Sequence, residues 1–146
     1  MARTYRMRGF ARFGNSMAAG LIRLGVGPAG LRLLRVPGRT TGLPRTTPVN
    51  VLEHDGRRWL VAPYGEVSWV RNVRAAGQAD LLRGGRAEHI RPQEASADEA
   101  VPVLRAYLRQ LRRVVGPYFD VTPDSPDAAF AAEAPRHPVF LVAGRD

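Results

Sequence analysis

Short blocks that mix apolar and polar residues, separated by Gly, Pro and Asp, cover most of the chain after residue 30. Such blocks are typical of antiparallel strands joined by tight turns. The pairs Asp55-Gly56 and Gly84-Gly85 predict two-residue hairpins. Pro48 is expected at an edge or a bulge, since it has no N–H to donate to a ladder. The predicted strands are Leu31–Val36, Arg45–His54, Arg57–Ala62, Ala79–Leu82, Arg86–Arg91 and His137–Ala143.

Other segments have apolar residues three and four positions apart, as amphipathic helices do. The first helix predicted covers residues 3–24, and a Gly-rich break over residues 25–30 ends it. A short helix is expected to follow the third strand, with Ser68 as its N-cap and Gly77 as its left-handed C-terminal residue.

Two more helices precede the last strand. Ser96 and Glu99 have the spacing of a capping box, and the apolar stripe behind them continues to Val115. Pro102 fits a helix interior badly, so the continuous helix is expected to begin near it. The last helix predicted covers residues 126–133, with Ser125 as its cap, Pro126 at its first position and Pro135 ending it.

This order of elements predicts an α+β fold built on a small barrel, because the strands follow one another through hairpins and no βαβ units alternate. The chain length fits one domain. We expect residues 1–146 to form it, with a basic helix and linker over 1–30 and the barrel over 31–146.

Charge is unevenly distributed. Residues 1–52 contain nine Arg and no acidic residue, whereas the rest contains 13 Arg and 13 acidic residues, so the formal net charge of +9 arises in the first third. A polyanionic partner is therefore expected there: nucleic acid, anionic lipid, or a ligand rich in phosphate and carboxylate. The absence of Cys fits a reducing compartment, and no apolar run approaches the roughly 18 residues of a membrane span. A cytoplasmic location is predicted.

Several familiar chemistries find no support. Residues 25–30 match the dinucleotide fingerprint in letters but follow a predicted helix and precede a strand, the reverse of the required order. The three His lack metal-ligand spacing, so no metal site is predicted. Ser68 lacks the second Gly of a nucleophile elbow, and nothing points to hydrolysis.

The segment from Gly38 to Pro48 contains two Gly, two Arg and four Thr. Gly allows close backbone approach, Arg supplies paired donors and Thr supplies hydroxyls, which together suit phosphate. From the pattern alone, an ordinary hairpin with solvated Arg is an equal alternative.

The same turn, the Asp55-Gly56 hairpin, the strand with Trp59-Leu60, and the run from Trp69 to Gly77 resemble the deazaflavin-dependent nitroreductase family. The similarity extends from about Leu34 to Arg91. It implies a split β-barrel that binds coenzyme F420, a 5-deazaflavin with a phosphate and an oligoglutamate tail. That polyanion would also account for the acid-free first third.

The resemblance assigns roles to particular residues. The phosphate and tail would contact Arg39, Thr40, Thr41, Gly42 and Arg45, and the deazaflavin would lie beside Thr46, Thr47, Pro48, Val49 and Asn50. The loop Ala62, Pro63, Tyr64 and Gly65 would border the site, and Trp69, Val70, Arg71 and Asn72 would close over the ring. The chain differs from many members at Thr40, where they have a basic residue, and at Val70, where they have an aromatic one.

The reaction implied is hydride transfer from reduced F420 to an electron-poor double bond, quinone or nitro group. Tyr118, Tyr64 or water would deliver the proton. A core or lid position for Tyr118 is an equal alternative.

Other functions stay open at this point. The chain could be an FMN-binding split-barrel protein, although one phosphate leaves the Arg excess less explained. It could instead carry a cofactor without turnover, or contact a membrane surface peripherally through its N-terminal helix. Specific nucleic-acid binding is not favoured, because the predicted strands lack aromatic residues interleaved with Arg. The sequence allows a monomer or a homodimer.

Overall fold

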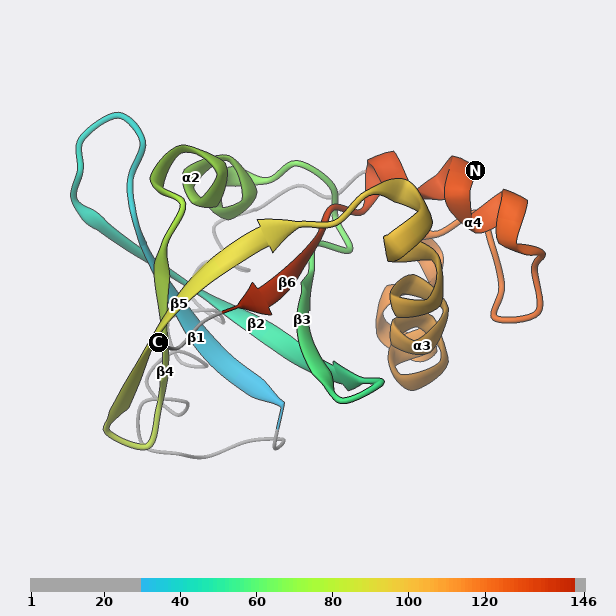
Figure 1. Cartoon of the computed structure of the whole chain (residues 1–146), viewed down its shortest axis with the longest axis horizontal. Coiled ribbons are helices and arrows are strands. Elements are labelled where there is room, and N and C mark those ends of the chain that lie inside the picture. Colours follow the sequence, from blue (N-terminus) through green and yellow to red (C-terminus); the bar gives the residue numbers. More distant parts are fainter. Residues whose placement is uncertain (1–29, 144–146) are drawn as a thin grey trace.

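The computed structural model describes residues 30–143, except for the side chain of residue 114. In this part of the chain six antiparallel strands close a barrel in the order β1-β2-β3-β6-β5-β4 (Figure 1). The strands are β1 (Leu31–Pro37), β2 (Pro44–His54), β3 (Arg57–Val61), β4 (Ala79–Arg83), β5 (Arg86–Glu94) and β6 (Val139–Ala143). The helices are α2 (Ser68–Ala76), α3 (Ala97–Val115) and α4 (Asp127–Glu133), with 3₁₀ turns η1 (Gly116–Tyr118) and η2 (Ala134–Arg136). The helix and linker predicted before residue 30 lie outside the described residues.

All six predicted strands are present, with ends shifted by up to three residues. Both predicted hairpins are confirmed: Asp55 and Gly56 have φ of 55° and 74°, and Gly84 and Gly85 have φ of 56° and 77°. Asp tolerates this left-handed region better than most residues and Gly adopts it freely, which is why these pairs reverse the chain.

Strand β2 divides its pairing between two neighbours. Residues 44–50 pair with β1, and residues 51–54 pair with β3. Pro48 therefore lies where β2 pairs on one side only, opposite Leu33, and the predicted edge position is confirmed. The side of β2 without a strand neighbour over residues 44–50 borders the cleft described below.

Helix α2 follows the expected range, but its N-cap prediction is wrong. The capping position is Val67, in extended conformation, and no side chain caps the helix. The Val67 carbonyl accepts from the N–H groups of Val70 and Arg71, so Ser68 already lies within the helix. Gly77 ends the helix with φ of 69°, as predicted.

The capping box of α3 is confirmed, because Ser96 and Glu99 exchange side-chain-to-backbone hydrogen bonds. The prediction that the continuous helix begins near Pro102 is wrong: α3 begins at Ala97 and contains Pro102. A proline here removes one helical hydrogen bond close to the helix start, and the capping box keeps the first turn in place.

The start of α4 also differs from the prediction. Pro126 occupies the capping position, and the Ser125 hydroxyl instead accepts from the N–H of Thr122 at 2.9 Å, within the loop before the helix. Pro135 lies in η2, directly after α4, so the predicted helix end is confirmed.

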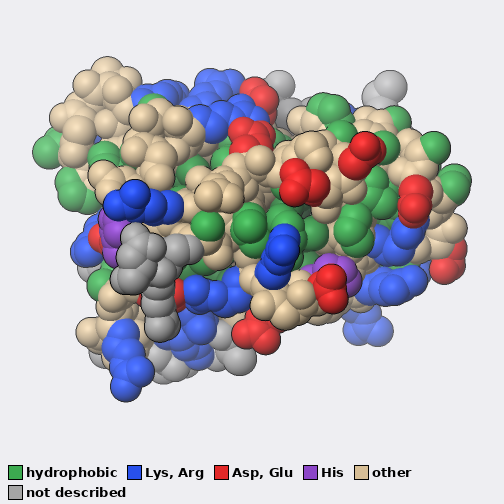
Figure 2. Space-filling model, viewed as in Figure 1, with side chains coloured by type: hydrophobic (Ala, Val, Ile, Leu, Met, Phe, Trp, Pro, Cys, Tyr) green, Lys and Arg blue, Asp and Glu red, His purple; other side chains and the backbone are tan. Residues whose placement is uncertain are grey.

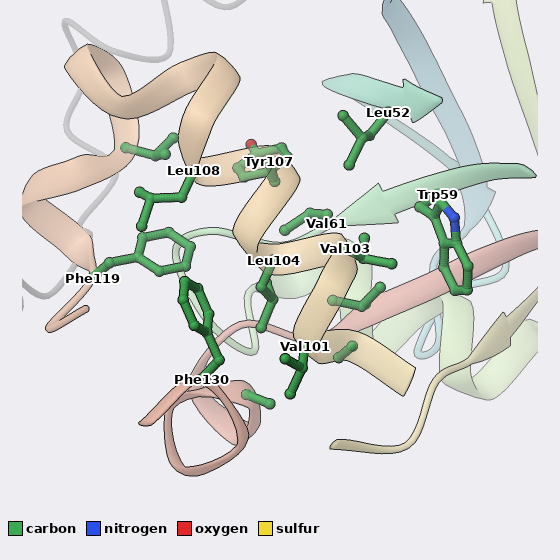
Figure 3. Packing of buried hydrophobic residues seen from close by; sticks show 14 residues of the cluster. Leu52, Trp59, Val61, Val101, Val103, Leu104, Tyr107, Leu108, Phe119 and Phe130 are labelled. Carbon is green, nitrogen blue, oxygen red and sulfur yellow. The ribbon is translucent and has the colours of Figure 1, made fainter. Parts of the chain in front are cut away.

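The core has two parts, because successive residues of a strand face opposite sides. Leu60 lies inside the barrel with Leu34, Phe140 and Val70 of α2. Its neighbours Trp59 and Val61 face outward and pack in the cluster beneath α3 and α4 (Figure 3). Helix α2 thus covers one end of the barrel, and α3 covers its outer face (Figure 1).

Candidate active site

A cleft of about 1010 Å³ lies between the β1–β2 turn, the first half of β2, the β3–α2 loop, α2 and the last part of α3. This volume is at the upper end of the range for small-molecule and cofactor sites. Fourteen of the residues predicted for the site line it: Arg39, Thr40, Thr41, Arg45, Thr46, Thr47, Pro48, Val49, Asn50, Pro63, Tyr64, Trp69, Arg71 and Asn72.

The β1–β2 turn is closed by its own backbone. The Gly38 N–H donates to the Leu43 carbonyl and the Gly42 N–H donates to the Gly38 carbonyl, both at 2.8 Å. Gly42 has φ of 74°, which favours glycine. A Cβ at Gly38 would lie 3.2 Å from the Leu43 carbonyl oxygen and 3.3 Å from the Thr41 hydroxyl. Glycine at position 38 therefore favours the compact turn, because a Cβ there would force its neighbours to shift by a few tenths of an ångström.

Asn72 ties this turn to α2. Its side chain is 4% exposed, and its Oδ1 accepts from the backbone N–H of Arg39 at 3.0 Å and from Arg39 Nη1 at 2.9 Å. Because this one oxygen accepts both hydrogen bonds, it fixes both the backbone and the guanidinium of Arg39. Asn72 therefore positions an arginine at the cleft, a more specific role than closing over a ring.

The cleft is positively charged. Arg39, Arg45 and Arg71 line it, and Glu66 is the one acidic lining residue among those that the structure describes. Glu66 pairs with Arg74 at 3.0 Å, and Arg74 also pairs with Glu94 at 2.6 Å. The hydrogen bonds that Arg74 donates to Glu94 raise the pKa of Arg74 further above its usual range. Figure 2 shows the arginine side chains gathered over α2, beside the turn, with acidic side chains at their edge.

These residues fit an anionic cofactor with a flat ring. A guanidinium whose position is fixed, further arginines and threonine hydroxyls are the donors that phosphate and carboxylate require. Trp69, Pro48 and Val49 add apolar surface to the same cleft. The donor set and the apolar wall therefore match the two halves of F420.

Five predicted residues do not line the cleft. Val70 is fully buried in the barrel core and Ala62 belongs to the same cluster, because both side chains point inward. Gly42 and Gly65 lie in the two loops, outside the lining residues. Tyr118 packs edge-on against Tyr64, with ring centroids 4.7 Å apart, and so contacts a residue that lines the cleft.

Helix α3 contributes residues that the sequence did not indicate. Tyr107, Leu111 and Val115 line the cleft. Leu111 and Val115 belong to the apolar stripe of this predicted helix, a pattern that indicates burial but not a position in a cleft. Tyr107 stands out in the sequence only as a phenol beside that stripe. No sequence pattern relates it to the β1–β2 turn, which lies more than 60 residues earlier in the chain.

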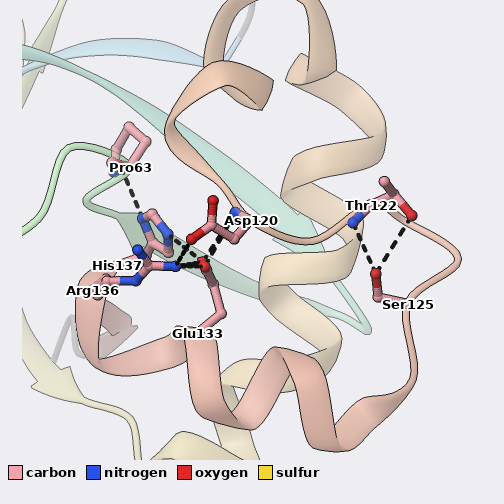
Figure 4. A network of polar contacts seen from close by, with 7 residues as sticks. All are labelled: Pro63, Asp120, Thr122, Ser125, Glu133, Arg136 and His137. Atoms are coloured by element: carbon pink, nitrogen blue, oxygen red, sulfur yellow. Dashed lines mark hydrogen bonds and ion pairs between the residues drawn. The ribbon is translucent and has the colours of Figure 1, made fainter. Parts of the chain in front are cut away.

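A buried polar group supports the loop that carries Tyr64 (Figure 4). His137 is 2% exposed, its Nδ1 lies 2.8 Å from the Pro63 carbonyl oxygen, and its ring stacks on Phe119. A carbonyl can only accept, so Nδ1 carries the proton. Its Nε2 lies 3.4 Å from Glu133, a buried carboxylate that also accepts from Arg136 and from the Asp120 N–H.

We expect His137 to make stability pH-dependent. Burial is the main cause that lowers the pKa of His137 below its usual value, so the unfolded chain binds more protons once the pH falls below about 6.5. The free energy of unfolding should be level above about pH 7 and fall as the pH drops toward 5. The hydrogen bond from Arg136 holds the pKa of Asp120 below its usual range. The Asp120 carboxyl therefore changes the free energy of unfolding only at lower pH than His137 does.

Urea unfolding at several pH values between 5 and 8 measures this effect. His137→Gln should flatten the slope, whereas the matched variant His54→Gln should keep the slope of the original protein. Equal slopes in all three proteins would show that His137 does not titrate in this window.

The comparisons with known proteins agree with this geometry. The family model described as F420H(2)-dependent quinone reductase matches residues 7–122. The solved structure of an F420-H2 dependent reductase, FDR-A, aligns with a TM-score of 0.53 and 21% identity, covering 81% of this chain and 97% of that one. Among curated proteins, no sequence matches the chain.

Two further solved structures share the fold. One, described as a domain-swapped dimer, has a TM-score of 0.54 and 18% identity over 92% of this chain and 100% of its own. A NimC/NimA family protein from Clostridium acetobutylicum has a TM-score of 0.50 and 12% identity over 89% of this chain and 80% of its own. At these identities the structures show the fold alone.

The expected split β-barrel is confirmed, and so is the F420-dependent function that the resemblance implied. No helix among residues 30–143 is long and apolar enough to cross a membrane. The family model spans most of the chain. The chain therefore belongs to the F420H(2)-dependent quinone reductase family, whose members use F420H2 to reduce electron-poor small molecules.

Proposed function

We propose that the cleft binds F420 with its phosphate and glutamate tail at the β1–β2 turn and its ring beside β2 and Trp69. The observation that carries this proposal is the Arg39–Asn72 contact, because it holds a guanidinium in place at the cleft. The Thr40 and Thr41 hydroxyls on the same turn, and Arg45 at the start of β2, also line the cleft and supply further donors. One phosphate plus several carboxylates uses this donor set more fully than the single phosphate of FMN.

When bound, F420H2 supplies hydride to an electron-poor acceptor. The chain's own residues bind and orient the reactants. Arg39, Arg45 and Arg71 would neutralise the anionic tail, while Trp69 and Val49 would exclude water from the ring. Tyr64 lines the cleft and can deliver a proton directly, whereas Tyr118 would act through its contact with Tyr64. Water is the alternative proton source.

Titration of the purified protein with oxidised F420 tests this proposal. Arg45→Ala should weaken binding about tenfold, because a hydrogen bond to a charged group contributes about 1.5–3 kcal/mol. Arg57→Ala is the matched control: Arg57 begins β3 and does not line the cleft, so its removal should leave the affinity unchanged. A parallel titration with FMN should give weaker binding.

Absence of F420 binding, or equal affinity in all three proteins, would reject the assigned cofactor position. Tighter binding of FMN than of F420 would favour the alternative cofactor. Raising the salt concentration should weaken binding to the original protein more than to Arg45→Ala, since the variant has one charge fewer to screen.

Predictions of location, oligomeric state and membrane contact accompany this proposal. We propose a cytoplasmic enzyme that acts as a monomer or a homodimer, with peripheral membrane contact through the basic N-terminal segment. The solved domain-swapped dimer with the same fold supports testing the dimer first. Light scattering of the purified chain would distinguish the two oligomeric states.

A further inference from the structure

Tyr107 is a buried phenol at the α3 side of the cleft. It is 3% exposed and lines the cleft together with Leu111 and Val115, which follow it on the same helix. Leu111 has φ of −119° and ψ of 22°, so the helix is interrupted between Tyr107 and Val115. Val61 of β3 belongs to the same core cluster as Tyr107 and Val115, and it also lines the cleft. We call these residues the α3 end of the cleft: the apolar side chains of Leu111, Val115 and Val61 beside the phenol of Tyr107.

The Tyr107 hydroxyl has no hydrogen-bond partner among the described residues. The hydroxyl oxygen is not one of the fully buried side-chain atoms that lack a partner, so the small exposed part of this residue includes the hydroxyl, which opens to the cleft. The packing of the ring beside Leu104 and Leu108 would be served equally by phenylalanine (Figure 3). A hydroxyl that the fold does not use, on a residue that lines the cleft, points to a ligand that uses it.

We propose that this end of the cleft is the acceptor subsite, where the Tyr107 hydroxyl donates a hydrogen bond to the carbonyl oxygen of a flat, apolar quinone or enone. The inference rests on the proposed function, because the cofactor ring must occupy the neighbouring part of the cleft. A flat ring suits the side chains of Leu111, Val115 and Val61, and one donor suits one carbonyl oxygen.

Hydride transfer places negative charge on the acceptor oxygen, which this hydrogen bond would stabilise. The acceptor would take a hydride from F420H2, whose C–H bond breaks as the cofactor is oxidised to F420. A new C–H or O–H bond forms on the acceptor, and the electron pair displaced from its double bond leaves negative charge on its oxygen. A donor already in place stabilises that oxyanion in a water-poor site. A proton from water then completes the hydroquinone or the reduced ketone, and Tyr107 keeps its own proton throughout. Burial, together with the nearby Tyr64, raises the pKa of Tyr107, which agrees with a lasting donor.

Binding of three probes to the F420-loaded protein tests the role of Tyr107 without turnover. The probes are 1,4-naphthoquinone, the anion of 2-hydroxy-1,4-naphthoquinone, and naphthalene, which has the ring but no oxygen. Calorimetric titration should show that Tyr107→Phe weakens the anion about tenfold and the neutral quinone about threefold, as expected for a charged and a neutral hydrogen bond. Naphthalene should bind equally to both proteins. In turnover of 1,4-naphthoquinone, kcat should fall more than KM rises.

Thermal unfolding provides the control for folding. Because the hydroxyl has no partner among residues 30–143, Tyr107→Phe should keep the melting temperature of the original protein. Equal losses for all three probes, or a lower melting temperature, would show that Tyr107 acts only in packing. Unchanged binding of all three would overturn the subsite. If the original protein binds no F420, the proposed function itself fails, which the titration shows before any quinone is added.

Discussion

Asn72→Leu should weaken F420 binding about a hundredfold while leaving the barrel folded. Leucine keeps most of the side-chain volume but removes the oxygen that accepts both hydrogen bonds from Arg39. Without these bonds the ligand itself must order Arg39 and the turn. One of the bonds involves a charged donor, so this ordering takes up to about 3 kcal/mol from the binding free energy, which corresponds to about two factors of ten in affinity. Titration with oxidised F420 measures the change.

A matched control separates this effect from a general loss of an amide. Gln110 is an exposed amide on α3 that does not line the cleft, so Gln110→Leu should bind F420 like the original protein. Amide hydrogen exchange gives a second measurement. The N–H groups of Gly38 and Gly42 close the turn, and they should exchange faster in Asn72→Leu. If Asn72→Leu binds F420 as tightly as the original protein and its Gly38 and Gly42 amides exchange at the original rates, the turn keeps its shape without Asn72.

Phe130→Ala should reduce the free energy of unfolding by about 3–5 kcal/mol, the usual cost of emptying a phenylalanine site in a core. Phe130 is fully buried and attaches α4 to α3. The Arg105 guanidinium carbon lies 4.6 Å from the centre of its ring, which adds a cation–π contact. Because small domains are stable by about 5–15 kcal/mol, this is a large part of the total. Urea unfolding measures it.

A graded series keeps this prediction testable if the alanine variant fails to fold. Phe130→Leu fills more of the space and should cost less than the alanine variant. Leu43 is the exposed counterpart, 62% accessible in the β1–β2 turn, and Leu43→Ala should change the stability by no more than about 0.5 kcal/mol. A similar cost at both positions would mean that the packing of α4 contributes little.

Much of the barrel could be predicted because its signals are local. The Asp55-Gly56 and Gly84-Gly85 pairs reverse the chain through backbone conformations that few other residues adopt, and strands on either side must then pair as neighbours. The capping box from Ser96 to Glu99 is likewise settled by residues three positions apart. The errors are local too: whether Val67 or Ser68 caps α2 depends on which carbonyl first accepts a helical hydrogen bond, and the residue types alone do not decide it.

Part of the cleft lining could be predicted from the sequence, for a similar reason. The turn with Arg39 and the start of β2 with Arg45 carry their donors within a few residues, so composition and spacing suited an anion site as well as an ordinary hairpin, and the family resemblance favoured the anion site. Val70 shows what such local reasoning misses. The sequence places it in the site between Trp69 and Arg71, but its side chain points into the barrel. The direction of a side chain follows from what the helix packs against.

The sequence by itself determined the hairpins, the ends of several elements, the basic first third and the grouping of Arg, Thr and Gly in one turn, because each depends on residues close together in the chain. Only the tertiary structure decided which helix holds the turn and which phenol enters the cleft. Asn72 meets Arg39 across 33 positions, and Tyr107 reaches the cleft because α3 packs on the outer face of the barrel. Such contacts arise from closure of the barrel and packing of the helices, which no local spacing encodes.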